Sequence, residues 1–292
     1  MSTAVASRAR RRARQTLTPG GRVAVTAKYA SLTVAAVVAL LPLVVSFMTS
    51  FKTRQEQLVS GPLSPPRNWL NLHNFAEAFT NGYMLTAFVN TTIILLISIT
   101  GTVFIGSMAA FAIDRFRFRF RGVVLWLFLI ASLVPPVSTQ VATFQIINYM
   151  GVFNTRTAPI LLYMGTDILS IYIFIQFIRS IPISLDEAAR IDGASTFKIY
   201  RSIILPLLKP AIATVVIVKG VYVYNDFYIP FLYMPSNDLG VMSTALFRFK
   251  GPYGAHWEII CAGAILVIVP TLILFVFLQR FIYNGFTMGA TK

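Results

Sequence analysis

The stretch EAARIDGASTFKIYRSIILPLLKP, from Glu187 to Pro210, is the most polar long segment in the second half of the chain. It lies between two segments that are apolar enough to be buried in lipid, Ala158–Phe177 and Ala211–Tyr233. A charged segment in this position has to leave the membrane, because charged side chains are costly in hydrocarbon. The fold therefore depends on which side of the membrane this segment lies and on what it contacts there.

The composition is that of a membrane protein. Of the 292 residues, 56% are hydrophobic and only 12% are charged, and the mean hydropathy is +0.71. A soluble globular chain carries about 25% charged residues. Lipid rather than water is therefore the expected surrounding of most of this surface.

Six apolar stretches are long enough to cross a bilayer, whose hydrocarbon core needs about 20 residues of helix. They are Tyr29–Met48, Phe88–Ile113, Val123–Ile146, Ala158–Phe177, Ala211–Tyr233 and Ile259–Ile282. Pro135 and Pro136 interrupt the third stretch, and neighbouring helices can satisfy the backbone groups that such a break frees. The first stretch is not typical of a cleaved signal peptide, because its apolar core is too long and lacks a small-x-small site. The sequence predicts an all-α, polytopic membrane protein with six transmembrane helices.

The distribution of positive charge predicts the orientation of these helices. Of the 25 Lys and Arg residues, 18 fall on one side of the predicted spans. Seven precede the first span, four lie in residues 115–121, five lie between the fourth and fifth spans, and two lie at the C-terminus. Six fall on the other side, and Lys219 lies within a span. Cytoplasmic loops carry the excess of Lys and Arg, so both termini and the Glu187 segment are expected in the cytoplasm.

The net charge of +15 follows the cytoplasmic loops and forms no single face, which argues against a nucleic-acid partner. Residues 1–27 are interpreted as a basic cytoplasmic arm, expected to be disordered and to touch anionic membrane lipid. Residues 28–292 are interpreted as the transmembrane domain, with residues 182–210 as its main cytoplasmic loop. The segment RFRFRFR, from Arg115 to Arg121, is better interpreted as an anchor at the membrane interface than as a nucleic-acid site.

The sequence carries no pattern typical of an enzyme. The single cysteine, Cys261, and the distant His73 and His256 argue against a metal site. The segment GTVFIGS, from Gly101 to Ser107, has two glycines at phosphate-loop spacing but lacks the lysine, and it lies in a predicted span. No Ser/His/Asp set converges on one side of the membrane. We expect a chain that is not an enzyme and holds neither metal nor cofactor.

The cytoplasmic loop predicts two short helices joined by a glycine hinge. Ser184 and Glu187 have the spacing of a capping box at the start of the first helix. Gly193 is typical of a helix C-terminus, and Ser195 can cap the second helix. One interpretation is an amphipathic connector on the membrane surface; the other is a slim helix that enters a pocket on another protein.

The pattern Glu-Ala-Ala, Asp-Gly-Ala and Leu-Pro over this loop closely resembles the EAA loop of permease subunits of ATP-binding-cassette (ABC) importers. In that family the first helix is a coupling helix seated in a cleft of the ATPase subunit. The resemblance implies that Glu187 pairs with a basic group of the ATPase and that Ala188 and Ala189 permit close seating. It also implies a turn at Gly193 flanked by Asp192 and Ala194, and packing of Phe197 at the socket.

The resemblance extends over nearly the whole chain after the basic arm. It is carried by SFKTRQE after the first span, VNTTII (Val89–Ile94), LVPPV in the third span and YNDFYIPFLY (Tyr224–Tyr233). The ending FLQRFIYNGFTMGATK is similar to that of maltose-type sugar permeases, specifically the second of two unlike subunits. It implies a second ATPase contact through the tail, at Gly285, Thr287 and Gly289.

The resemblance implies the type I ABC-importer permease fold and a multi-pass protein of the bacterial inner (plasma) membrane. The implied partners are a second unlike permease, an ABC ATPase dimer and an extracytoplasmic sugar-binding protein. ATP and Mg²⁺ would be bound by the ATPase subunits. The chain would form half of a sugar-translocation path.

Polar residues inside the predicted spans are the second set of candidate functional residues. They are Asp167, Lys219, Tyr222, Tyr224, Asn225 and Asp226. Lys219, Tyr222 and Asp226 share a face of the fifth span with Val223. These residues could line a sugar path, with the two tyrosines stacking on sugar rings. The alternative is that they hold helices together, for example through a pair between Lys219 and Asp167.

Three other functions remain open at this point. An ABC permease could carry a non-sugar solute such as an osmolyte or glycerol phosphate. An ion-coupled secondary carrier would have no use for a charged loop that needs a partner. A non-transporting scaffold would not need proline-broken spans or charges within the membrane.

Overall fold

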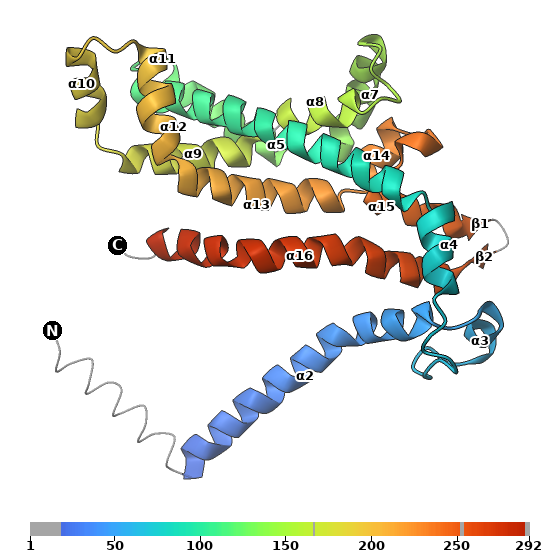
Figure 1. Cartoon of the computed structure of the whole chain (residues 1–292). Helices are drawn as coiled ribbons and strands as arrows, with labels where there is room; N and C mark the ends of the chain where they lie inside the picture. Colours follow the sequence, from blue (N-terminus) through green and yellow to red (C-terminus); the bar gives the residue numbers. More distant parts are fainter. Residues whose placement is uncertain (1–18, 166, 252–253, 290–292) are drawn as a thin grey trace.

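The computed structural model describes residues 19–165, 167–251 and 254–289, with side chains for those between 22 and 273 and for Val276. The regular secondary structure of these residues is helical except for one two-stranded antiparallel sheet (Figure 1). Its elements are α2 (Pro19–Ser50), α3 (Arg54–Val59), α4 (His73–Asn81), α5 (Met84–Arg115), α6 (Arg121–Leu133), the 3-10 turn η1 (Pro136–Thr139), α7 (Gln140–Tyr149), α8 (Thr157–Gly165), α9 (Ile168–Ser180), α10 (Ser184–Ile191), α11 (Thr196–Ile199), the π-helical turn η2 (Tyr200–Ile204), α12 (Leu205–Leu207), α13 (Lys209–Asn225), α14 (Tyr228–Tyr233), the 3-10 turn η3 (Asn237–Leu239), α15 (Met242–Ala245), the 3-10 turn η4 (Leu246–Phe249), β1 (Lys250–Gly251), β2 (Gly254–Ala255) and α16 (Trp257–Gly289).

Helix α5 is the central element of the bundle, with α8, α9 and α13 packed against it (Figure 1). Two glycines of α5 allow this close approach. Gly106 faces the ring of Phe174 in α9, which would lie 3.3 Å from an added Cβ, and Gly101 faces Met164 of α8. Small residues let membrane helices pack closely, so these two positions set the spacing of α5 from α8 and α9.

The largest described hydrophobic cluster lies at one end of the bundle, where α10 to α12 join α13. It contains Phe111 of α5, Ile178 of α9 and Ile204 of η2, all of them buried. Burying a side chain of this size away from water contributes about 1.5–3 kcal/mol. The cluster therefore fixes the short helices of the polar loop to the ends of the long ones.

Three predicted spans lie within single helices. Tyr29–Met48 lies in α2, Phe88–Ile113 in α5 and Ile259–Ile282 in α16. Only two of the described helices, α2 and α5, are by themselves long and apolar enough to cross a membrane, and α16 adds a shorter apolar run, Trp257–Ile273.

The remaining spans are interrupted. The two halves of the third, α6 and α7, meet at 94° beside Pro135, and the two halves of the fourth, α8 and α9, meet at 43° beside Asp167. The prediction of one continuous fifth span is wrong, because α13 ends at Asn225 and Asp226 Oδ1 accepts a hydrogen bond from the N–H of Tyr228 at the start of α14. A further bend of 71° separates α12 from α13. Counting each bent pair as one span, the described helices give up to five, and six stays a prediction.

Helix α2 diverges from the bundle, and the C-terminal end of α2 lies close to the start of α16 (Figure 1). It begins at Pro19, so the arm that was assigned to residues 1–27 is helical from residue 19, and residues 1–18 lie outside the described part. The last carbonyls of α2 accept hydrogen bonds both from the N–H groups of Phe51 and Lys52 and from side chains. The buried Asn74 donates to Ser50 O at 2.8 Å and Lys52 O at 2.7 Å.

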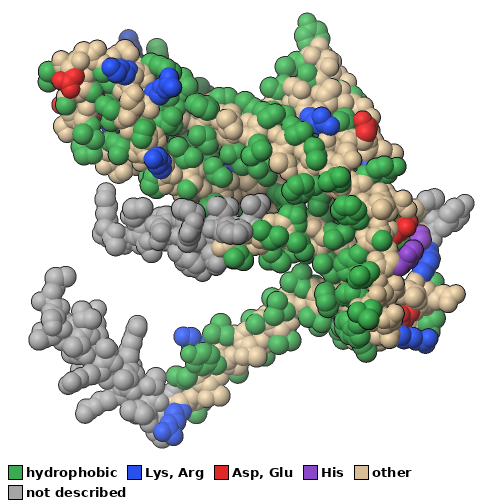
Figure 2. Space-filling model, in the orientation of Figure 1, with side chains coloured by type: hydrophobic (Ala, Val, Ile, Leu, Met, Phe, Trp, Pro, Cys, Tyr) green, Lys and Arg blue, Asp and Glu red, His purple; other side chains and the backbone are tan. Residues whose placement is uncertain are grey.

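Figure 2 shows apolar side chains over the visible faces of α2 and the bundle, with Lys and Arg side chains gathered around the α10–α12 end. A helical surface of this kind is that of a membrane protein, because lipid tails cover apolar side chains without cost.

Candidate functional site

The polar loop between α9 and α13 folds as predicted into two short helices, α10 and α11, separated by a glycine turn. Gly193 has a φ of +76°, in the left-handed region. Its N–H donates to Arg190 O at 3.0 Å, and the N–H of Ala194 donates to Ala189 O at 2.9 Å. These two bonds form a Schellman motif. Ser195 then caps α11 by accepting a hydrogen bond from Lys198 N at 3.3 Å, so both of these predictions are confirmed.

The predicted capping box at the start of α10 is wrong. Ser184 is already helical, the N-cap position is Ile183, and no side-chain capping bond forms there. The N–H groups of Asp186 and Glu187 instead donate to Ile183 O at 3.0 and 3.1 Å. Backbone carbonyls of the turn that begins at Pro182 thus accept hydrogen bonds at this helix start, where the side chains of the box were expected to accept them.

Helix α10 has one face turned to its own chain and one turned outward. The inner face carries Asp186 and Ala189, which are 4% and 8% exposed. The outer face carries Glu187, Ala188 and the 86% exposed Ile191. Ala189 is therefore not available for seating on an ATPase: it packs in the chain's own hydrophobic cluster, since the helical period places it one turn from Asp186.

The other predicted coupling residues lie on the open side of the loop. Asp192 and Gly193 are exposed and Ala194 is half-buried. Phe197 is 60% exposed, with its ring centroid 6.3 Å from that of the buried Tyr200. The exposed residues of this group are named the coupling face, after the role that the resemblance implies: Glu187, Ala188, Ile191, Asp192, Gly193 and Phe197.

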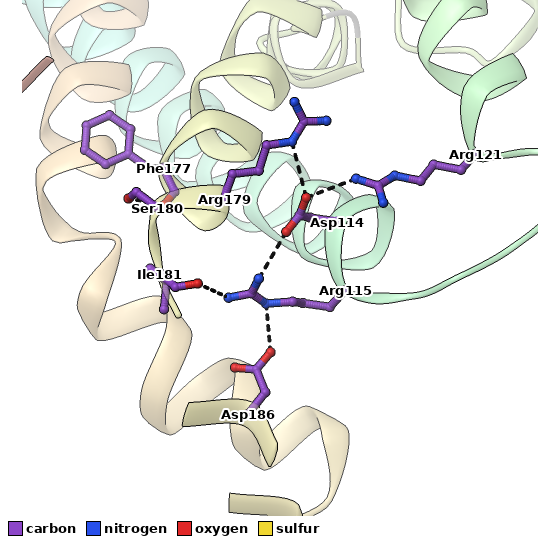
Figure 3. A network of polar contacts seen from close by, with 8 residues as sticks. All are labelled: Asp114, Arg115, Arg121, Phe177, Arg179, Ser180, Ile181 and Asp186. Atoms are coloured by element: carbon purple, nitrogen blue, oxygen red, sulfur yellow. Dashed lines mark hydrogen bonds and ion pairs between the residues drawn. The ribbon is translucent and has the colours of Figure 1, made fainter. Parts of the chain in front are cut away.

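A network of ion pairs fixes α10 to the end of α5 (Figure 3). Arg115 Nε lies 2.7 Å from Asp186 Oδ2, and both side chains are about 5% exposed. The same guanidinium contacts Asp114 Oδ2 at 3.2 Å and donates to Ile181 O at 2.9 Å. One residue of α5 therefore holds α10 and the segment that leads into it.

The Arg115–Asp186 contact is a close ion pair whose geometry at Nε is not that of a hydrogen bond, and Asp186 Oδ1 has no hydrogen-bond partner among the described residues. Removing one partner of a buried pair leaves an uncompensated charge and costs about 3–5 kcal/mol. The position of α10 is consequently sensitive to either side chain.

Asp114 extends the network to two further cations. Its Oδ1 lies 3.1 Å from Arg121 Nη2 and 3.4 Å from Arg179 Nε (Figure 3). The sequence interpretation placed Arg115 and Arg121 in an interfacial anchor and gave Asp186 only a place in the first turn of a helix. In the sequence, the adjacent Asp114 and Arg115 at the end of a predicted span were the one local signal of a buried network.

The intramembrane polar residues fall into two groups. In the first, Lys219 Nζ lies 3.5 Å from Asp167 Oδ2 and 5.4 Å from the centroid of the Tyr222 ring. Tyr163, which the sequence interpretation did not include, donates from its hydroxyl to Asp226 Oδ2 at 2.9 Å, and its ring packs edge-on against Tyr222. The structure thus brings four of the six candidates together.

The second group points elsewhere. Tyr224 is buried and donates to Val267 O of α16 at 2.7 Å, and Asn225 is exposed and donates to Val221 O of its own helix at 2.8 Å. The tail residues Gly285, Thr287 and Gly289 lie in the last turns of α16, beyond the residues whose side chains the structure describes.

Comparison with known proteins identifies the class. Residues 102–286 match the family described as binding-protein-dependent transport system inner membrane component. The chain belongs to this family of ABC transporter permeases, and it is a membrane component of a transporter rather than an enzyme.

Three relatives match over most of their length. AraQ, an arabinooligosaccharides transport system permease protein of Halalkalibacterium halodurans, is 32% identical over 88% of this chain and 92% of its own. MelC, a melibiose/raffinose/stachyose import permease protein of Bacillus subtilis, is 31% identical over 76% and 82%. AmyC, a probable starch degradation products transport system permease protein of Thermoanaerobacterium thermosulfurigenes, is 32% identical over 86% and 91%.

A solved structure shows the same fold. A chain of a bacterial ABC transporter involved in the import of the acidic polysaccharide alginate superposes with a TM-score of 0.77, covering 90% of this chain and 98% of that chain at 19% identity. The expected resemblance to ABC-importer permeases is confirmed in sequence and in fold.

Proposed function

We propose that the chain is the transmembrane permease subunit of a binding-protein-dependent ABC sugar importer. It is the second of two unlike permeases and forms half of the translocation path in a bacterial cell membrane. Family membership supports the transport role, and three relatives whose names specify oligosaccharide or starch products support sugars. A permease for an osmolyte or glycerol phosphate is the alternative that the relatives' names disfavour.

The observation that carries the proposal is the geometry of α10. Its coupling face is exposed, and its inner face is fixed to α5 by the buried Arg115–Asp186 pair. A helix held in this way can pass a displacement to the bundle instead of absorbing it. An amphipathic connector lying on lipid would turn an apolar face outward, whereas the outer face of α10 carries Glu187 and Arg190 beside Ile191.

An external energy source is required. Moving a transporter from about 1:99 to 99:1 between two states takes roughly 5.5 kcal/mol of differential binding. We infer that a partner ATPase dimer supplies it by binding ATP and Mg²⁺ and closing around the coupling face, where Glu187 pairs with a basic group. Residues Gly285 to Gly289 of α16 are proposed as a second contact with the same dimer.

The remaining partners follow from the orientation. With six spans and both termini in the cytoplasm, the α3, α4 and η3–β2 segments face outward and meet an extracytoplasmic sugar-binding protein. Of the intramembrane candidates, Tyr222, which is 53% exposed, and Asn225 have exposed side chains, and we propose that these two line the path. We propose that the Asp167–Lys219 pair fixes the part of α13 that presents Tyr222 to the path.

Site-directed crosslinking tests the coupling role. In a Cys261→Ser background, Ala188→Cys carries a benzophenone maleimide on the coupling face, and Val59→Cys, 88% exposed on α3 at the opposite end, is the matched control (Figure 1). In assembled complex, the probe at position 188 is expected to crosslink to the ATPase and the probe at position 59 is not. Crosslinks from position 188 to lipid alone, in a complex that contains the ATPase, would reject the proposal.

The solute is tested separately. The binding protein that activates the reconstituted complex is purified, and the solute that it carries is identified by mass spectrometry. A mono- or oligosaccharide is expected. An osmolyte or glycerol phosphate would replace the sugar assignment without affecting the coupling role.

A further inference from the structure

We propose that α5 is the rigid rod that connects the coupling helix to the extracytoplasmic loop around η3, and that Arg115 and Asn90 are the positioning residues at its two ends. This inference rests on the proposed function. It names the route by which binding-protein docking on one side of the membrane reaches the ATPase on the other.

The cytoplasmic end of α5 is joined to the α10–α12 unit at two independent places. Arg115 holds Asp186 and Ile181 O through buried contacts (Figure 3). Two turns earlier, the hydroxyl of Ser107 lies 2.7 Å from that of Tyr200, and both residues are buried. A displacement of α10 therefore cannot occur without moving the end of α5 or breaking these contacts.

The opposite end of α5 holds the η3 loop just as closely. The amide of the fully buried Asn90 donates to Asp238 O and to Gly240 O, both at 2.9 Å. Its carbonyl accepts from Arg156 Nε at 2.8 Å, which adds the loop before α8. The neighbouring Thr91 Oγ1 accepts from Met242 N at 3.0 Å. Both segments lie on the side predicted to face outward.

Between these ends α5 has no break. From Asn90 to Arg115 a helix rises about 38 Å, which exceeds the roughly 30 Å of a bilayer core. The sequence of α5 contains no proline, whereas α2 contains Pro42 and α16 contains Pro270. The α6–α7, α8–α9 and α12–α13 pairs are all bent by more than 40°. Among the described helices of the bundle, α5 is thus the one that can transmit a displacement along its axis.

Coupling through one rod has a measurable signature. If ATP raises the affinity for the binding protein by some factor, the binding protein raises the affinity for ATP by the same factor. Weakening either end of the rod lowers that single factor. Abolishing the contacts at one end removes the coupling by itself, so abolishing those at the other end as well lowers the factor no further, because the two ends act in series.

The experiment uses the full complex in lipid nanodiscs. The readouts are the stimulation of ATP hydrolysis by loaded binding protein and the affinity of that protein with and without a non-hydrolysable ATP analogue. Asn90→Asp keeps the shape and the Arg156 contact but removes both donors, and Asp186→Asn removes the charge facing Arg115. Coupling factors of this kind are typically about 5- to 150-fold. Each variant is expected to bring the factor close to one, and the double variant to match the stronger single variant.

Matched controls separate transmission from folding. Thr92→Val removes a hydroxyl that bonds only Phe88 O of its own helix, and Arg117→Gln removes an exposed cation next to the network. Both are expected to keep the wild-type factor. If Asn90→Asp or Asp186→Asn fails to assemble, Thr91→Val and Arg115→Lys replace them, with a partial loss of the factor expected.

If Asn90 and Asp186 had a purely structural role, the hydrolysis and affinity measurements would show a different pattern. Basal and stimulated hydrolysis would then fall in proportion to the amount of intact complex, leaving the ratio and the coupling factor unchanged, and this result would overturn the proposal. If wild-type complex shows no nucleotide-dependent stimulation at all, the proposed function fails before the rod is tested.

Discussion

The ammonium group of Lys219 lies 3.5 Å from Asp167 Oδ2, so that the middle of α13 is tied to the break between α8 and α9. Both side chains are largely buried, at 8% and 13% exposed. Each charge alone would be costly inside a membrane, and together they neutralise one another. The pairing that was one of two alternatives in the sequence interpretation is present in the structure.

The first prediction concerns this pair. Lys219→Met leaves the Asp167 carboxylate without its cation, and loss of thermal stability in detergent is expected, by an amount equivalent to about 3–5 kcal/mol. The double variant Lys219→Met/Asp167→Asn removes both charges and should recover most of that loss. A double variant as unstable as Lys219→Met would mean that the pair contributes more than mutual neutralisation.

The second prediction separates the two tyrosines that were both expected to stack on sugar rings. Tyr222→Ala is expected to raise the KM of sugar uptake by reconstituted complex, because the ring is exposed and is proposed to line the path. Tyr224→Phe keeps the ring and removes the hydrogen bond to Val267 O, worth about 1 kcal/mol of stability. Its KM should be unchanged. Unaltered kinetics in both variants would remove Tyr222 from the path.

The third prediction concerns the turn that ends α10. Gly193→Ala meets no neighbouring atom but must adopt a φ of +76°, which costs about 1–2 kcal/mol for a residue with a Cβ. Gly193→Pro cannot adopt that φ and also loses the hydrogen bond to Arg190 O. Sugar uptake per ATP hydrolysed should fall modestly in the first variant and be lost in the second, with normal membrane insertion.

Gly61→Ala provides the control for this series. It also has open space around an added Cβ, and its φ lies outside the left-handed region. Uptake per ATP should therefore match wild type. Normal coupling in Gly193→Pro would show that the turn does not position the coupling face.

The fourth prediction concerns the end of α2. Asn74→Ala removes the donor of the Ser50 and Lys52 carbonyls, and the site is buried, so no water replaces it. A loss of about 2 kcal/mol in stability is expected. Asn81→Ala, which removes an exposed amide that donates to Glu77, should change stability by less than about 0.5 kcal/mol. Thermal denaturation of the two variants in the same detergent makes the comparison.

Sequence patterns predicted local structure well where short-range chemistry decides it. The turn at Gly193 and the cap at Ser195 depend on backbone geometry within a few residues, and both are present. The break in the third span was predicted from Pro135 and Pro136. The capping box failed because Ile183, an apolar residue with no capping side chain, already starts the turn.

The long-range contacts could not be predicted in this way. Arg115 and Asp186 are 71 positions apart, and only the adjacent Asp114 distinguishes Arg115 from the exposed Arg117. The burial of Ala189 likewise depends on how α10 lies against α5 and α9, which residue types in one helix do not specify. Helix α13 ends at Asn225, and the following Asp226 accepts a hydrogen bond from Tyr163, a contact between distant segments that local sequence does not reveal.

The Schellman turn and the buried arginine leave the loop with few alternative conformations before any partner arrives. Ordering the backbone of a flexible segment costs about 1–2 kcal/mol for each residue. The backbone of residues 184–199 is already ordered in the free chain, so under the proposed function this entropy is lost on folding rather than on docking. A synthetic peptide of the same sequence, free of the α5 anchor, should therefore compete poorly for the ATPase even though it offers the same contacts.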